Sequence, residues 1–152
     1  MPSHTEQLLL PYSPEQLFDI VADVKDYPRF IPWCQEARIR QSDPALIIAD
    51  LAIGFGPFRE SFTSHVDLDR PHQVLVRAVD GPLEHLTNRW VFTPAGDATR
   101  IAFSIDFRFK SHLLDHVAEG MFHDANTRMV RAFEIRAHEI YAGPHGASAA
   151  PT

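Results

Sequence analysis

The chain has 152 residues and a formal net charge of −6, and 45% of its residues are hydrophobic while 22% are charged. This composition is typical of one globular domain and excludes an intrinsically disordered chain. The acidic balance argues against a broad nucleic-acid-binding face, which needs clustered lysine and arginine, so DNA is not expected as a partner.

The sequence shows no signal for export or for membrane insertion. Its single cysteine, Cys34, cannot form an internal disulfide. No secretory signal begins at Met1, and no apolar run approaches the roughly 20 residues of a membrane-spanning helix. We therefore expect a cytoplasmic, bacterial protein or a mature form from which a leader has been removed.

The first 30 residues predict a strand and two short helices. Residues 3–10 form the strand. Ser13 is suited to cap a helix, and Gln16 is placed to complete a capping box, so a helix is expected to run from here to about Val24. A second short helical turn is expected before Pro28.

The middle of the chain predicts an antiparallel meander. From Glu36 to Phe109, apolar and polar residues alternate with the period of two that strands show, and short turns separate the runs. Six strands are expected, at residues 38–42, 46–53, 58–68, 73–79, 84–93 and 99–109. In the last of them, one face carries Ile101, Phe103, Ile105, Phe107 and Phe109.

A helix of about 30 residues is expected after Ser111, and Gly143 and Pro144 should end it near Tyr141. Its apolar stripe consists of Leu114, Val117, Met121, Ala125, Met129 and Phe133. The centre of this stripe drifts between residues 120 and 125, which predicts a bend or a change in what the helix packs against.

The end of the chain, GPHGASAAPT at residues 143–152, is small and polar. We expect it to be disordered and expect one folded domain at residues 1–142.

The predicted fold class is α+β. Seven antiparallel strands have one apolar face to cover, and a helix of about 30 residues spans about 45 Å. A curved sheet wrapped around this helix, with the two short helices after the first strand, is the helix-grip arrangement. It leaves room for an elongated apolar cavity.

Three motifs on this framework resemble a known family. They are VADV followed by YPRFIPWC at residues 21–34, DGPLEHLTNRWVFTP at 80–94, and MVRAFEIRA at 129–137. The chain resembles the coenzyme Q-binding START-domain family within the polyketide cyclase-like START superfamily, over about residues 3–142. A sister group, the bacterial ribosome association toxins, shares most of the pattern; the pair Trp33–Cys34 favours the quinone group.

The resemblance implies a non-enzymatic carrier for a ubiquinone-type isoprenoid quinone or another lipid, supporting respiratory electron transport or quinone synthesis, with peripheral contact at the inner membrane. The quinone is then a ligand, and no cofactor is expected. The sister group implies an alternative, a ribosome-associated factor that blocks subunit joining. A third alternative is a polyketide cyclase or dehydratase, which needs a titratable residue inside the cavity.

The candidate ligand-binding residues are apolar or aromatic, and they could equally fill a core. From the YPRFIPWC segment they are Phe30, Ile31 and Trp33; from the strands Phe58, Phe62, Leu86, Trp90, Phe103 and Phe107; and from the long helix Val117, Met121, Met129 and Phe133. Candidate contacts for a polar head are Glu60, Ser64 and Asn88.

A histidine-rich stripe and the single cysteine are weaker candidates for a metal site and for a nucleophile. A stripe of His112, His116, Glu119 and His123 has the spacing of a zinc site but should face solvent, so no metal is expected. Cys34 lacks a recognisable base beside it and is expected to be a small buried hydrophobe.

Arg128, Arg131 and Arg136 make part of the long helix basic. Local ion pairs, for example to Glu134 and Glu139, are the expected reason. The alternatives are contact with anionic lipid headgroups or, in the sister-group interpretation, with ribosomal RNA.

Overall fold

The computed structural model describes residues 3–55, 58–78 and 80–142, so the tail predicted to be disordered lies outside the described residues. Seven strands, two α-helices and one 3-10 helix are found in this part of the chain. In order they are β1 (Ser3–Leu10), α1 (Pro14–Ala22), η1 (Val24–Arg29), β2 (Cys34–Ser42), β3 (Leu46–Phe55), β4 (Phe58–Asp69), β5 (Gln73–Ala78), β6 (Leu83–Ala95), β7 (Ala98–Phe109) and α2 (His112–Tyr141).

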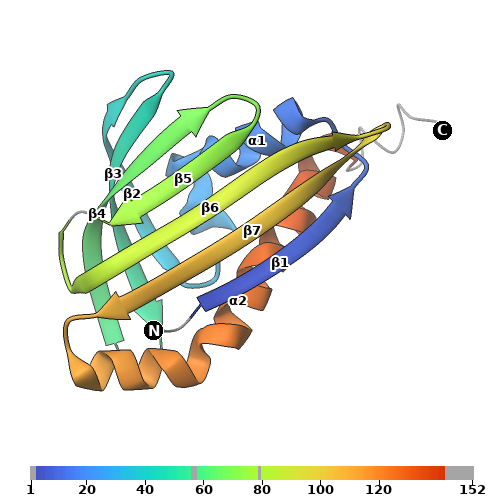
Figure 1. The fold of residues 1–152 in the computed structure, drawn as a ribbon. Coiled ribbons are helices and arrows are strands. Elements are labelled where there is room, and N and C mark those ends of the chain that lie inside the picture. The colour runs from blue at the N-terminus through green and yellow to red at the C-terminus, as the bar shows by residue number, and fades with distance from the viewer. Residues whose placement is uncertain (1–2, 56–57, 79, 143–152) are drawn as a thin grey trace.

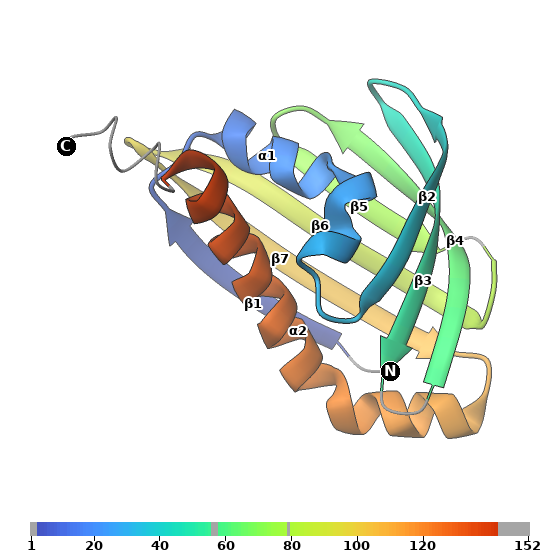
Figure 2. The ribbon, with the colours of Figure 1, turned by 180° about the vertical axis from the view of Figure 1, so that it is seen from behind.

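The strands form one antiparallel sheet in the order β1-β7-β6-β5-β4-β3-β2. The sheet curves, and α1, η1 and α2 all lie on its concave side (Figure 1, Figure 2). The predicted helix-grip fold of class α+β is confirmed. No helix in the described residues has both the length and the apolar character needed to cross a membrane.

Local sequence signals account for the ends of several elements. The Ser13 side chain accepts a hydrogen bond from the Gln16 amide, and the Gln16 side chain accepts one from the Ser13 amide, which is the predicted capping box. Gly81 adopts a φ of +94°, and a Cβ there would lie 2.8 Å from the Ser61 carbonyl oxygen. Only glycine fits this turn before β6 without strain.

The curvature of the sheet has a local cause. The register shifts between Cys34 and Glu36, between Ile39 and Gln41, and between Leu83 and His85 mark irregular pairings in β2 and β6. Extra residues of this kind bend a strand and increase its twist. They allow the β2–β4 side of the sheet to curl towards the helices (Figure 2).

Helix α2 changes direction partway along its 30 residues, as the drift of its apolar stripe predicted (Figure 1, Figure 2). The first half crosses the end of the sheet where β7 ends and β4 begins. The second half runs along the concave face beside β1. Its Val130, Phe133 and Ala137 are buried in the core, whereas Leu113 and Met121 of the first half are exposed.

The YPRFIPWC segment is fastened to the second half of α2. The Tyr27 and Phe30 rings meet the Phe133 ring edge-on, with centroids 5.5 and 5.0 Å apart. Arg136 pairs with Asp26 at 2.5 Å, and its guanidinium lies 5.6 Å from the centre of the Phe30 ring. Part of this segment therefore packs the core.

The arginine pairs differ in part from the expectation. Arg136 does reach Glu139, at 3.5 Å, but its closer carboxylate is Asp26, which is 110 residues away in sequence. Arg128 pairs with Asp124 at 3.0 Å. Glu134 lies 4.0 Å from His138.

Removing the Asp26 charge should destabilise the fold more than removing an exposed one. The side chains of Asp26 and Arg136 are 13% and 24% exposed, and the Nε of Arg136 is buried without a hydrogen-bond partner in the described residues. Because Asp26→Asn leaves a largely buried cation short of its anion, the free energy of unfolding should fall by about 2 kcal/mol in urea denaturation.

Asp19→Asn is the matched control, because Asp19 and Arg70 are each 52% exposed. It should cost no more than about 1 kcal/mol. Equal losses for the two variants would show that the Asp26 pair does not fasten η1 to α2.

Candidate functional site

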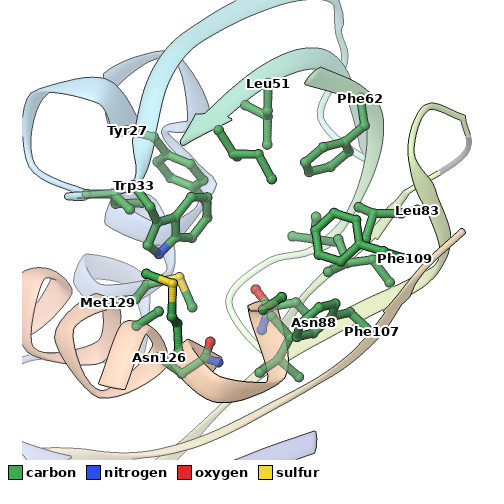
Figure 3. A pocket seen from close by; sticks show the side chains of 18 of the residues that line it. Tyr27, Trp33, Leu51, Phe62, Leu83, Asn88, Phe107, Phe109, Asn126 and Met129 are labelled. Carbon is green, nitrogen blue, oxygen red and sulfur yellow. The ribbon is translucent and has the colours of Figure 1, made fainter. Parts of the chain in front are cut away.

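An apolar cavity lies between the concave face of the sheet and α2 (Figure 3). Its sheet wall consists of Leu51, Ile53, Phe62, Val76, Leu83, Leu86, Asn88, Trp90, Ile105, Phe107 and Phe109. Tyr27, Ile31 and Trp33 close one side, and α2 contributes Ala118, Met121, Ala125, Asn126, Met129 and Phe133. Five strands, the η1 region and the long helix therefore share the site.

The cavity is large enough for part of a guest molecule and is open on one side. The space that the centre of a water-sized sphere can reach is about 150 Å³. A water takes up roughly 30 Å³ in the liquid, so the space corresponds to about five waters. Including the part that opens to solvent, the empty volume is about 970 Å³.

Nine of the thirteen candidate ligand-binding residues lie on the walls of this one cavity. They are Ile31, Trp33, Phe62, Leu86, Trp90, Phe107, Met121, Met129 and Phe133. The structure thus gathers residues from the YPRFIPWC segment, the sheet and the helix. That they bind a ligand stays a prediction.

The other four candidates lie elsewhere. Phe30 lines a separate groove against α2. Phe103 is buried beside Trp90, its cross-strand partner on β6, with the two ring centroids 4.7 Å apart, and it does not line the cavity. Val117 is half-buried, and its neighbour Ala118 faces the cavity in its place. The side chain of Phe58 lies outside the described residues.

Some wall residues were not among the candidates although the sequence contained a signal for them. Ile105 and Phe109 share the strand face of Phe107, and Ala125 belongs to the predicted helix stripe. Asn126 gave no such signal, because a buried amide beside an apolar stripe cannot be told from a solvated one by periodicity.

Two buried carboxamides interrupt the apolar wall, and Figure 3 shows them on the same side of the cavity. The Asn88 Nδ2 donates to the Ser104 carbonyl oxygen at 2.9 Å, and its Oδ1 accepts from the Trp90 Nε1 at 3.0 Å. These two bonds fix the orientation of the Asn88 amide. Asn126 is buried on the α2 side.

The other two candidates for a polar head do not line the cavity. Ser64 is fully buried within the sheet, and its hydroxyl donates to the Ala49 carbonyl oxygen at 3.1 Å. Glu60 is half-buried on β4 and is absent from the cavity wall.

The titratable groups near the cavity are poorly placed for catalysis. Burial holds the pKa of the Tyr27 hydroxyl well above its usual range, with smaller contributions from Cys34 and Asp23, and this hydroxyl donates to the Val21 carbonyl oxygen. Burial also raises the pKa of the Cys34 thiol to about 11. Among the described residues, the wall contains no acid, base or thiol besides Tyr27.

The histidine stripe of α2 does not form a metal site in the described residues, where no three His, Cys, Asp or Glu side chains are placed to hold an ion. His112, His116 and His123 are exposed, and the His123 ring meets the His4 ring edge-on at 5.3 Å.

A second groove, separate from the cavity, is lined by basic residues. It lies between the Phe30–Pro32 segment and the second half of α2. Four arginines, Arg29, Arg128, Arg131 and Arg136, line it together with Glu139. Three of them have acidic partners in Asp26, Asp124 or Glu139, so the groove is only moderately positive.

Comparison with other proteins shows relatives that are similar to this chain in sequence. The family model described as polyketide cyclase/dehydrase and lipid transport matches residues 10–134. The ribosome association toxin RatA of Escherichia coli K12 is 36% identical over 143 residues, which cover 93% of this chain and 90% of the toxin. The mitochondrial coenzyme Q-binding protein COQ10 homolog B of Xenopus laevis is also 36% identical, over 91% of this chain and 59% of that protein.

The fold has solved counterparts as well. A START superfamily protein of Mycobacterium smegmatis superposes with a TM-score of 0.77 at 17% identity, over 91% of this chain and 98% of that one. At this identity the likeness concerns the fold alone. The family match shows that the chain belongs to the polyketide cyclase/dehydrase and lipid transport family, and the solved structure shows that its fold is START-like.

Proposed function

We propose that this protein is a non-enzymatic carrier that binds a ubiquinone-type isoprenoid quinone in the cavity under the sheet. The observation that carries the proposal is the apolar, half-open cavity where a folded domain would normally have packed core. The similarity to a protein named for coenzyme Q binding supports a quinone as the guest.

The energetics of an isoprenoid tail suit this cavity. Burying a methylene contributes about 0.8 kcal/mol, so each five-carbon isoprene unit offers roughly 3–4 kcal/mol before ordering costs. Two or three units suffice for micromolar binding. A long tail does not fit whole into a cavity whose empty volume is about 970 Å³ with its open part included, so the rest must leave through the open side.

A protruding tail links the proposal to a membrane. Because apolar chain exposed to water is unfavourable, the tail leaving the cavity would be covered best at a lipid surface. Peripheral contact with the inner membrane, and a role in respiratory electron transport or quinone synthesis, are therefore part of the proposal.

The chemistry of the wall favours binding over catalysis. A cyclase or dehydratase would need a group that can exchange protons near pH 7, and the pKa of Tyr27 is raised away from that range. Cys34 is buried and does not line the cavity. A carrier needs neither group to ionise.

Filling the cavity should abolish loading. In a quinone-producing host, the wild-type protein should co-purify with quinone, measured by mass spectrometry of its organic extract. Ala125→Phe places a ring in the space that α2 leaves open, so the recovered quinone should fall by about tenfold or more, while the thermal midpoint changes little.

His116→Phe adds a ring to the exposed face of the same helix and should load like wild type. If neither quinone nor any other lipid is recovered from the wild-type protein, the carrier proposal is rejected. Undiminished loading of Ala125→Phe would place the ligand outside this cavity.

A second candidate function is binding to a ribosomal subunit. It is favoured by the similarity to RatA and by the groove of four arginines, which could contact RNA phosphates. The net charge of −6 opposes it, so any such contact must be local to this groove.

Cosedimentation with ribosomal subunits tests this second function. If it holds, the double variant Arg128→Glu/Arg131→Glu should bind about tenfold more weakly. Its affinity should also depend less steeply on salt, because each phosphate that an arginine no longer neutralises reduces the slope by about one unit. Arg100→Glu/Arg108→Glu, on exposed positions of β7, should bind like wild type. No cosedimentation of the wild type at moderate salt would reject this function.

A further inference from the structure

We infer that the two buried carboxamides of Asn88 and Asn126 select a guest with a neutral head that carries hydrogen-bond acceptors. The inference rests on the proposed carrier function and assigns the part of the cavity that recognises the head. The shared chemistry of such heads is a carbonyl or ether oxygen on an uncharged ring, as in a quinone.

The hydrogen bonds of Asn88 leave it a donor to offer. A carboxamide has two N–H donors and an oxygen with two lone pairs. One N–H is used by the Ser104 carbonyl oxygen, and one lone pair by the Trp90 indole. The second N–H and the second lone pair remain on a side chain that is only 8% exposed and lines the cavity.

The same two bonds make this donor rigid. Trp90 is almost fully buried, and its ring packs against Phe103 and Phe133, each with a centroid distance of 4.7 Å. The Trp90 indole therefore holds the Asn88 oxygen in place, and the Ser104 backbone holds its nitrogen. A preorganised donor loses little freedom when a guest oxygen arrives.

Asn126 brings a second carboxamide from a different element. It lies on α2, is 5% exposed, and borders the same space as Asn88 (Figure 3). An amide can donate and accept at once, so the α2 side can also meet a polar atom of the head. A ring seated beside the two carboxamides would then have polar neighbours from both β6 and α2.

The rest of the wall rejects a charged head. Among the described residues, the cavity is lined by no lysine, arginine, histidine, aspartate or glutamate. A carboxylate or phosphate buried there would lose its hydration without gaining a counter-ion, which is far more costly than burying a carbonyl group. Fatty acids and phospholipid headgroups are therefore poor occupants of this position.

Two ligands with the same tail separate recognition of the head from recognition of the tail. The first is a ubiquinone with two isoprene units, and the second is a benzene ring with the same tail and no oxygens. Isothermal titration should show that wild-type protein binds both and prefers the quinone. In Asn126→Leu and in Asn88→Leu, this preference should fall by about two- to tenfold, the value of one neutral hydrogen bond.

The ratio of the two affinities within one variant cancels general loosening of the cavity, including the loss of the Trp90 partner in Asn88→Leu. His116→Leu, on the exposed face of α2, changes no cavity residue and should keep the wild-type ratio. Unchanged ratios in both asparagine variants, with both ligands still binding, would overturn the inference and leave the carrier function standing.

Two further outcomes of these titrations test the inference. If neither ligand binds the wild-type protein, the carrier function fails and the inference fails with it. The same tail carrying a phosphate should displace the quinone from the cavity at least about tenfold more weakly than the benzene analogue does. Equal or stronger displacement by the phosphate would contradict a neutral head.

Discussion

The structure depends on a mismatch of shape between a curling sheet and the helix that it surrounds. A helix is a rod of side chains about 10–12 Å across, and a sheet bent by irregular pairings in β2 and β6 cannot follow it along its whole length. The second half of α2 packs closely, with Val130 and Ala137 almost fully buried. Where α2 turns away, the small side chains of Ala118 and Ala125 line the space, and the cavity remains.

The packed region around the second half of α2 and the cavity beside its first half thus have different roles. Around Phe133, the η1 segment, Trp90 and α2 form a packed region that the Asp26–Arg136 pair fastens from outside. This region holds Trp90, Trp90 orients Asn88, and Asn88 faces the cavity. The packed region therefore holds the Asn88 amide in a fixed orientation inside the cavity. The apolar wall contributes affinity but does not orient a guest, and the fixed amide can orient it.

Local patterns in the sequence are sufficient to predict the fold, but they predict only part of the candidate site. The capping box at Ser13 and the alternation along β7 depend on neighbouring residues, so they were readable in advance. Phe103 and Phe107 share one strand face, yet only Phe107 lies where α2 has turned away. The sequence cannot show this position, because it depends on how two distant elements dock. The pairing of Asp26 with Arg136, across 110 residues, has the same origin.

The central claim, that the space under the sheet is an apolar hollow open to a guest, is tested most directly by xenon. Dry apolar cavities bind xenon, whereas polar sites hold ordered water. A crystal of the ligand-free protein under xenon pressure should show xenon between Phe107 and Met129. Absence of xenon, with side chains closed over that space, would contradict the account.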